Sequence, residues 1–491
     1  MSSSSAVQEA VSDANHAEDR FGRVEVHGID YIPVGERHGR ARELFMVWAS
    51  SNTTYLNILL GGGLVVAGLN TWQALAVVVA GNAFWALVGF VAVTGPVSGT
   101  PSSVTARSMF GIRGNRVNAA LIGWDTCVAY EAINLAVGSL AAFALVKELG
   151  AQPSTPVKLL IVIVTAGITL AISVYGHATI VRMSGLFTVL LVTCMAVLAV
   201  FVVGHADLGY TPPRALSGSA LWVAVFGGLT IIASAPLGWG ISADYARYLP
   251  PSTSPRAVAA WTAIGGFLPC TLLGGLGVLA GTAVDMTDPQ TSLKEILPSW
   301  FYPVFLAVIA VSSLTSNVLT MYSSGLSLQA MGIKARRSFT VAFDGLLGVA
   351  LTIYALFISD FLDTLDNILQ FTVIVLGPNI AIYAADIVLR RNRYDGMDLH
   401  NESPGGPFWF TRGFNLAGIG AQIIGTVVGL LCVNTTLMVG PVAAALGGTD
   451  LSAVVSPLVG ALVYTVLTLA AHGRSRTGRA TTSTAAFRPS P

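Results

Sequence analysis

The sequence predicts an all-α membrane protein with about twelve transmembrane helices. Two inverted repeats of five helices are expected, with helices 1 and 6 broken and two extra C-terminal helices after them. Three observations support this fold class. Hydrophobic residues make up 53% of the 491 positions and charged residues only 10%, whereas soluble globular proteins carry about 25% charged residues. Long apolar runs recur along the chain, and residues that disfavour helix interrupt the first and the sixth of them.

The apolar runs number about twelve, because a helix that crosses a bilayer needs about 20 mainly apolar residues. Their centres lie near Leu56, Val79, Ala132, Ile168, Met195, Thr230, Leu268, Val311, Leu347, Val375, Ile424 and Tyr464. Residues 44–472 therefore form one predicted transmembrane domain. The polar segments 1–43 and 473–491 are predicted to be disordered cytoplasmic tails.

Lys and Arg residues are distributed unevenly between the two sides of this domain. With the N-terminus inside, 22 of the 26 fall in inner loops and tails, and the four on the outer side are Lys147, Lys158, Arg214 and Lys294. Positively charged loops stay on the cytoplasmic side of a membrane. An odd number of spans would place the Arg-rich C-terminal tail outside. The sequence therefore predicts a multi-pass protein of the plasma or inner membrane, surrounded by lipid, with both termini in the cytoplasm.

Composition and motifs argue against several other classes of protein. The net charge is +1 and the basic residues form no stripe, so no nucleic-acid partner is expected. The four cysteines lie in apolar runs without a CxxC pair, which indicates buried side chains rather than a disulfide or a metal centre. An enzyme would need catalytic groups at membrane depth, and His177 is the one histidine near a span. The sequence also lacks a repeated selectivity filter typical of a channel, and it indicates neither a cofactor nor an oligomeric state.

Two breaks in the predicted helices point to a carrier. The first span contains the polar run Trp48–Thr54, and the sixth contains Ser234–Gly240, which holds one proline and two glycines. Irregular backbone at membrane depth occurs where protein or a water-filled cavity covers it. Carriers use such discontinuous helices to bind solute and ion near the bilayer midplane, in inverted repeats. Breaks five spans apart therefore favour a secondary carrier for a small solute.

Polar residues of the third span are candidates for the solute site. Tyr130 and Asn134 are four residues apart and share a helix face. An aromatic ring and a carboxamide on one face could stack on a flat heterocycle and bond its edge. The alternative is that Tyr130 packs against the eighth span and Asn134 bonds a neighbouring backbone. Glu131 points about 100° away from Tyr130. It is a candidate proton carrier, or it neutralises a charged partner elsewhere in the bundle.

Hydroxyl groups of the eighth span are candidates for a cation site. Ser312, Thr315 and Ser316 share one face. Together with free carbonyl groups of a broken first helix, they are the neutral oxygen ligands that a hard cation such as Na⁺ accepts. Alternatively, each hydroxyl bonds a carbonyl of its own helix, as is common in membrane helices.

Four parts of the chain, the first made of two neighbouring motifs, resemble in matching order the nucleobase–cation symporter family, in its purine–cytosine permease branch. Gly95–Gly99 and Ala106–Gly114 are similar to the family's GP-x-x-G stretch and SR-x-x-FG-x-x-G loop. Ser234–Pro250 resembles the W-x-x-x-ADY-x-R-Y-x-P signature, and Asn317–Gly325 the N-x-x-x-x-YSSGL stretch. Gly377–Asp386 is similar to the GP-x-x-x-x-x-x-x-D pattern of helix 10.

The resemblance implies import of a nucleobase or related heterocycle with Na⁺ or H⁺ by alternating access. By position, Tyr130 would stack on the base, Asn134 and Asn317 would bond its edge, and Ser234 and Trp239 would face the same cavity. In Na⁺-coupled members the matching ligands are Thr315 and Ser316, with carbonyls near Ala49, Asn52 and Ser312. The sequence departs from the family pattern where Tyr130 replaces an expected Trp. Glu131 beside it is unusual for a purely Na⁺-coupled member, so the sequence is compatible with coupling to either Na⁺ or H⁺.

A carrier of the same fold for another solute, such as a hydantoin, allantoin, a vitamin or an amino acid, is the alternative. An amino-acid carrier would hold a carboxylate with helix amides at a Gly-rich break. Here the break is Ser50–Thr54, and the glycines Gly61–Gly63 lie further along, which fits that solute less well.

Overall fold

The computed structural model describes residues 28–175, 177–287, 289–333, 337–359 and 361–483. Within these residues, ten helices are long and apolar enough to cross a membrane, and two shorter apolar helices accompany them, Tyr55–Val66 and Leu416–Cys432. Every centre predicted from the sequence lies in one of these helices. Residues 1–27 and 484–491 of the two predicted tails lie outside the described part of the chain.

The first span consists of two helices, α2 (Glu43–Asn52) and α3 (Tyr55–Val66), as the polar run predicts. Side chains of the run compete with the helical hydrogen bonds. Ser50 Oγ donates to the Val47 carbonyl, Asn52 Nδ2 to the Trp48 carbonyl, and Thr53 Oγ1 to the Ala49 carbonyl. The helix stops after Asn52 because Thr53 and the residue after it take non-helical backbone angles.

The sixth span is broken as well. Helix α13 (Gly218–Gly238) ends directly before Trp239, and the short helix α14 (Ala243–Ala246) resumes after four residues without α-helical structure. Pro236 lies inside the last turn of α13 and has no amide hydrogen to continue the ladder. The Trp239 amide bonds the Pro236 carbonyl instead. The break therefore lies at the C-terminal end of the predicted segment.

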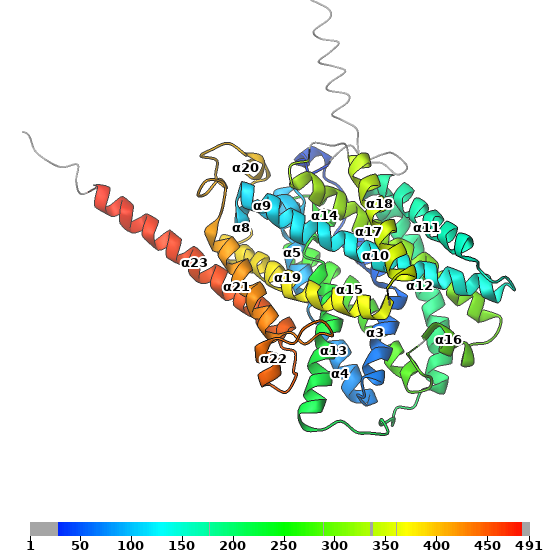
Figure 1. Cartoon of the computed structure of the whole chain (residues 1–491). Coiled ribbons are helices and arrows are strands. Elements are labelled where there is room, and N and C mark those ends of the chain that lie inside the picture. Colours follow the sequence, from blue (N-terminus) through cyan, green and yellow to red (C-terminus); the bar gives the residue numbers. More distant parts are fainter. Residues whose placement is uncertain (1–27, 176, 288, 334–336, 360, 484–491) are drawn as a thin grey trace, which may run out of the picture.

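The remaining helices complete a bundle around these two spans (Figure 1). In chain order they are η1 (Val34–Glu36), α4 (Thr71–Asn82), α5 (Trp85–Ala92), α6 (Thr94–Ser98), α7 (Ser102–Thr105), α8 (Arg107–Phe110), α9 (Ile112–Asn118), η2 (Ala119–Trp124), α10 (Asp125–Glu148), α11 (Thr155–Tyr175), α12 (His177–His205), α15 (Pro255–Gly281), α16 (Pro289–Ser292), η3 (Leu293–Glu295), α17 (Phe301–Ala330), α18 (Arg337–Phe357), α19 (Phe361–Arg390), α20 (Gly396–His400), α21 (Leu416–Cys432), α22 (Pro441–Ala445) and α23 (Ser452–Ser483). Among them, η2 is a π-helix.

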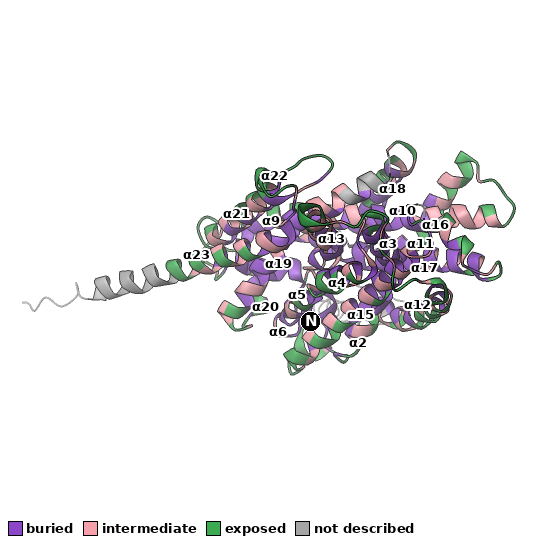
Figure 2. Ribbon diagram, turned by 90° about the horizontal axis from the view of Figure 1, so that it is seen from below, coloured by how far each residue is buried: buried purple, intermediate pink, exposed green. Residues whose placement is uncertain are grey.

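Small residues let helices of the bundle pack backbone to backbone. A Cβ atom at Gly61 would collide with the Gly274 carbonyl, and one at Gly277 with the Ile58 carbonyl. Helices α3 and α15 therefore touch directly, as small residues allow between membrane helices. Burial follows from this packing. In Figure 2, α17 and α19 carry long purple stretches of buried residues, whereas exposed residues are frequent on α12 and on the coloured part of α23.

The buried carboxylate of Asp386 joins α19, the tenth span, to its neighbours. Its oxygens accept hydrogen bonds from Ser108 Oγ at 2.8 Å, Tyr394 Oη at 3.0 Å and Tyr464 Oη at 2.6 Å. Arg390, one turn further along α19, forms an ion pair with it at 2.9 Å. The donors come from α8, the loop after α19, and α23. Asp386, the acid of the Gly377–Asp386 motif, therefore ties α23, one of the two extra C-terminal helices, to the bundle.

Residues 28–42 pack onto the end of the bundle that carries α8, α9 and α20, called here the arginine-rich end (top of Figure 1). Ile32 is fully buried and its amide bonds the Gly99 carbonyl. Arg37 donates to the Pro96 carbonyl at 2.7 Å, and Arg247 donates to the Gly28 carbonyl at 2.6 Å. This part of the predicted N-terminal tail is thus folded in the structure, and residues 473–483 of the predicted C-terminal tail continue α23.

Candidate solute and cation site

The two helix breaks meet at a cluster of aromatic rings. Trp48, near the end of α2, lies 5.1 Å from Trp239 in the sixth-span break and 5.3 Å from Tyr245 on α14, between ring centroids. Trp85 of α5 packs against the same indole at 5.4 Å. All three contacts are edge-to-face, the arrangement that aromatic pairs favour. The cluster holds both breaks at one level of the bundle.

Tyr130 of α10 lies against the sixth span just before its break. Its hydroxyl donates to the Ser234 carbonyl at 3.0 Å. A Cβ atom at Gly238 would lie 3.2 Å from the same hydroxyl, so the glycine makes room for the tyrosine. The structure therefore brings Tyr130, Ser234 and Trp239 together at the break. The hydroxyl of Tyr130 is engaged with the protein, which leaves its ring as the group that can contact a solute.

Helices α10 and α17 run antiparallel in direct contact. A Cβ at Gly138 would lie 2.9 Å from Ser313 Cβ, and one at Gly123 would lie 2.5 Å from Ser327 Oγ. Asn134 is one turn before Gly138 on the same face of α10, and Asn317 is one turn after Ser313 on the same face of α17. This register places the two asparagines at the same level on facing helices.

Both asparagines are buried, and Asn317 keeps a side-chain oxygen without a partner inside the described part of the protein. Asn134 is 6% exposed and Asn317 is 2% exposed. Asn317 Oδ1 is buried without a hydrogen-bond partner in the described chain. A carboxamide offers two donors and two acceptor positions, and a buried one left unpaired costs about 1–3 kcal/mol. An unpaired, buried carboxamide oxygen on Asn317, facing the level of Asn134, indicates a polar ligand.

The predicted cation ligands also come together, at the contact between α2 and α17. Thr315 Oγ1 lies within hydrogen-bond distance of two acceptors, the Ser50 carbonyl at 3.0 Å and the Ser312 carbonyl at 2.7 Å, which share its single proton. A small cavity lined by Ser50 and Thr315 lies beside this contact, between α2, α11, α12 and α17.

The carbonyls proposed to complete the cation site already accept protein donors. Thr53 donates to the Ala49 carbonyl through both its amide and its hydroxyl, and Asn57 Nδ2 donates to the Asn52 carbonyl at 2.7 Å. A carbonyl oxygen has two lone pairs, so the Asn52 carbonyl keeps one for a hard cation, whereas Thr53 engages both lone pairs of the Ala49 carbonyl. Ser316 lies next to Thr315 on α17 and is buried. The site therefore stays a prediction.

Glu131 points away from this region, toward α18. A Cβ atom at Gly348 would lie 2.5 Å from Glu131 Oε1, so the carboxyl group packs on the bare backbone of α18. Glu131 is 1% exposed, and its Oε2 has no hydrogen-bond partner among the residues that the structure describes.

A narrow cavity of about 40 Å³ leads from the sixth-span break toward the arginine-rich end. It is lined at the break by Leu237, Gly238, Gly240 and Ile241, in the π-helix by Ile122 and Gly123, and elsewhere by residues that include Ser327 and Asn379. A π-helix widens the backbone and occurs often at functional sites. The cavity is a candidate for part of the solute pathway.

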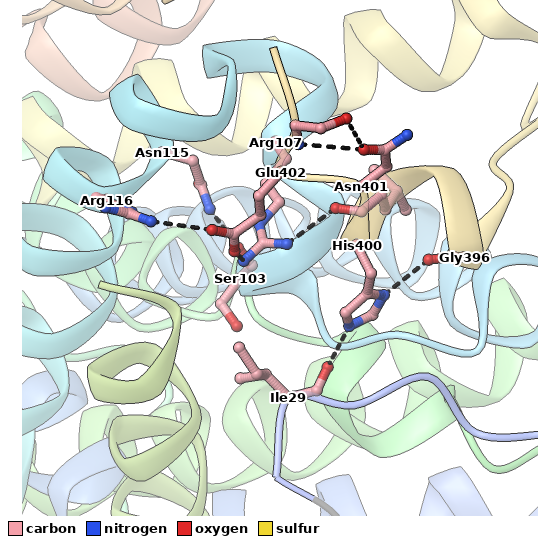
Figure 3. A network of polar contacts seen from close by, with 11 residues as sticks. Ile29, Ser103, Arg107, Asn115, Arg116, Gly396, His400, Asn401 and Glu402 are labelled. Carbon is pink, nitrogen blue, oxygen red and sulfur yellow. Dashed lines mark hydrogen bonds and ion pairs between the residues drawn. The ribbon is translucent and has the colours of Figure 1, made fainter. Parts of the chain in front are cut away.

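Ion pairs cover the arginine-rich end beyond this cavity (Figure 3). Arg107 and Arg116 both contact Glu402, at 2.7 Å and 2.9 Å. Burial lowers the pKa of the Arg107 guanidinium, and the Glu402 carboxylate opposes that shift. His400 in the same network contacts the Ile29 carbonyl at 3.0 Å. The first inner loop, the N-terminal segment and the segment after α19 are thus joined at this end.

Two residues of this region, Asp344 and Trp48, were not among the site residues predicted from the sequence. Asp344 of α18 is fully buried and accepts a hydrogen bond from Trp124 Nε1 at 2.6 Å. It is the one acid in an otherwise apolar stretch of the ninth span, which is a signal of functional interest in itself. Trp48 carried no such signal, because the aromatic cluster joins residues from three separate segments.

Comparison with known proteins decides the family. The family model for permeases for cytosine/purines, uracil, thiamine and allantoin matches residues 31–456. This chain belongs to that family. YxlA of Bacillus subtilis, a candidate purine-cytosine permease, is 26% identical over 467 residues, covering 91% of this chain and 96% of the relative. The purine-uracil permease NCS1 of Arabidopsis thaliana is 24% identical over 77% of this chain and 68% of its own length.

Solved structures show the same fold. The nucleobase-cation-symport-1 family transporter Mhp1, closed with bromovinylhydantoin bound, matches with a TM-score of 0.72 at 16% identity, over 89% of this chain and 94% of Mhp1. Its inward-facing form matches with a TM-score of 0.69 at 15% identity, over 92% of this chain and 96% of that one. The predicted fold class and family resemblance are confirmed. The protein is a multi-pass membrane transporter for nucleobase-like solutes and not an enzyme.

Proposed function

We propose that this permease imports a nucleobase or related heterocycle by cation symport with alternating access. The observation that carries the proposal is the buried, unpaired carboxamide oxygen of Asn317, at the level of the buried Asn134 between α10 and α17. The ring of Tyr130 lies one turn away on α10, and the sixth-span break with Trp239 borders it. A flat ring with donors and acceptors along its edge matches an aromatic platform and two carboxamides.

Uptake into proteoliposomes tests this proposal. We expect Asn134→Ala and Asn317→Ala each to abolish uptake while the protein still inserts and elutes as a single species. The matched control is Asn82→Ala, a buried asparagine of α4 whose Nδ2 already bonds the Val78 carbonyl of its own helix. Normal uptake by both site variants would show that the solute binds elsewhere.

A panel of labelled solutes identifies the cargo. Relatives of this chain are named for different rings, including purine and uracil, vitamin B6 and allantoin. The panel therefore contains cytosine, purines, uracil, allantoin, a hydantoin, thiamine, pyridoxine and an amino acid. Preference for a nucleobase supports the proposal, and preference for an amino acid contradicts it.

Two groups are candidates for the coupling ion. Thr315 and its neighbours would hold Na⁺, and Glu131 would hold a proton. Imposing Na⁺ and pH gradients separately distinguishes them, and solute accumulation without a Na⁺ gradient removes the role proposed for Thr315 and Ser316. Import also rests on the proposed orientation, with the arginine-rich end and both termini in the cytoplasm. Labelling of single cysteines added at the two ends tests that orientation.

A further inference from the structure

We propose that Glu131 and Asp344 form a proton-binding carboxyl pair between α10 and α18, apart from the solute cavity. This inference rests on the proposed function, because a proton site has a role only in a coupled carrier.

The two acids come from helices that run side by side in the same direction. Trp124 Nε1 donates to Asp344 Oδ1 at 2.6 Å, and Thr352 Oγ1 donates to the Ala132 carbonyl at 3.2 Å. Between these two contacts, Glu131 lies against Gly348, which is one turn after Asp344 on the same face of α18. The two carboxyl groups are therefore about one helical turn, ~5 Å, apart along the bundle.

Neither acid is neutralised within the described chain. Glu131 is 1% exposed and Asp344 is fully buried, and one oxygen of each, Glu131 Oε2 and Asp344 Oδ2, has no hydrogen-bond partner there. The ion pairs among the described residues involve other acids. A buried pair of uncompensated negative charges costs several kcal/mol. Binding one proton removes half of that charge.

The surroundings favour a proton over a metal cation. A Cβ atom at Gly345, the residue after Asp344, would lie 2.9 Å from Met321 Cε and 3.9 Å from Leu170 Cδ1. Helices α17 and α11 thus present apolar groups to this face. A hard cation takes six or more oxygen ligands, whereas a proton needs one carboxylate oxygen.

Other ionisable groups lie near the pair without neutralising it. Cys127, one turn before Glu131, is within electrostatic range of both acids and of Asp244 on α14. Asp244 accepts a hydrogen bond from the amide of Ser102 at 2.7 Å and feels the charge of Arg247. Arg247 donates to Tyr322 Oη at 3.0 Å on α17. No basic residue is bonded to the pair from the described parts of α10, α11, α17 and α18.

A short polar path joins the pair to the narrow cavity at the arginine-rich end. Ser324 of α17 lies close to Asp344. Ser327, one turn further along α17, lines that cavity and faces Gly123 of the π-helix. A proton that leaves the Glu131 carboxyl group can pass to the Asp344 carboxylate and then to water near Ser327. Each transfer moves one proton between oxygen atoms and needs no other reactant.

The test uses the full-length protein in sodium-free proteoliposomes that contain pyranine as an internal pH indicator. The solute is the nucleobase that shows the highest uptake in the panel described above. For one proton per solute, an inward gradient of one pH unit sustains up to about tenfold accumulation. We expect the wild type to approach that ratio and to acidify the vesicle interior. Glu131→Gln, which has nearly the same volume, should equilibrate the base at a ratio near one while base–base exchange continues.

Two further variants complete the design. Asp344→Asn keeps an acceptor oxygen for Trp124 and should also lower accumulation, while exchange continues. Asp125→Asn removes an exposed carboxylate at the start of the same helix and should behave as the wild type. If Glu131→Gln cannot be obtained folded, Asp344→Asn alone tests the inference. Accumulation of the base by Asp344→Asn to the wild-type level would overturn the proposed carboxyl pair.

Three other results would overturn the inference. The first is a wild-type protein that exchanges base but does not respond to the pH gradient. The second is a Glu131→Gln protein that still accumulates the base about tenfold. The third is a folded Glu131→Gln protein that also loses base exchange, which would place Glu131 in the solute site. A wild type that neither binds nor exchanges any base would instead contradict the proposed function.

Discussion

Tyr130 offers a way to separate the role of a ring from the role of a hydroxyl in solute binding. Its hydroxyl donates to the Ser234 carbonyl at 3.0 Å, so Tyr130→Phe removes one neutral hydrogen bond and keeps the ring. Tyr130→Ala removes both. If the ring is the platform for the base, the two substitutions should differ widely in their effect on affinity.

The expected magnitudes follow from these contacts. A neutral hydrogen bond contributes about 0.5–1.5 kcal/mol, and Tyr130 makes this one within the protein, so its loss weakens both the free and the bound state. The dissociation constant of Tyr130→Phe should therefore rise by less than about tenfold. Stacking of a base on an aromatic side chain contributes about 1–3 kcal/mol, which predicts a rise of about 5- to 150-fold for Tyr130→Ala.

Equilibrium binding of the labelled base to purified protein in nanodiscs, at fixed pH and salt, measures both constants. A single elution peak and an unchanged melting temperature establish that each variant is folded. Equal losses for Tyr130→Phe and Tyr130→Ala would show that the hydroxyl contacts the solute, against the geometry described. If Tyr130→Ala binds the base with wild-type affinity, the ring of Tyr130 does not contact the solute.

Two further predictions concern contacts between helices. Gly277→Ala should lower the melting temperature, because the added methyl group collides with the Ile58 carbonyl and overpacking costs about 1–3 kcal/mol; Gly63→Ala, which meets open space, is the control, and equal melting temperatures would contradict the close packing. Thr315→Val should destabilise the protein by about 0.5–1.5 kcal/mol, because it removes the hydroxyl that bonds α17 to the Ser50 carbonyl, and Thr315→Ser should retain most of that stability. Equal melting temperatures of the Val and Ser variants would mean that this bond contributes nothing.

Much of the architecture follows from local sequence. Scarcity of charge requires an apolar solvent, and a run of about 20 apolar residues has few stable forms in a membrane other than a helix. The first break is also local, since Ser50, Asn52 and Thr53 bond carbonyls three or four residues back. Pro236 similarly disrupts its own turn. Motif order alone indicated the family that the comparison then confirmed.

The arrangement of the site depended on contacts between distant segments. Asn134 and Asn317 are separate signals in the sequence, and only the register of α10 against α17 places them at one level. The sequence did not say which helix Glu131 faces, and only the packing on Gly348 directs its side chain toward α18, which carries Asp344. Helical periodicity tells which residues share a face, but it does not say which helix that face meets. Composition and local hydrogen bonding thus determined the spans and their breaks, whereas helix packing decided which polar groups are brought together and which are left without a partner.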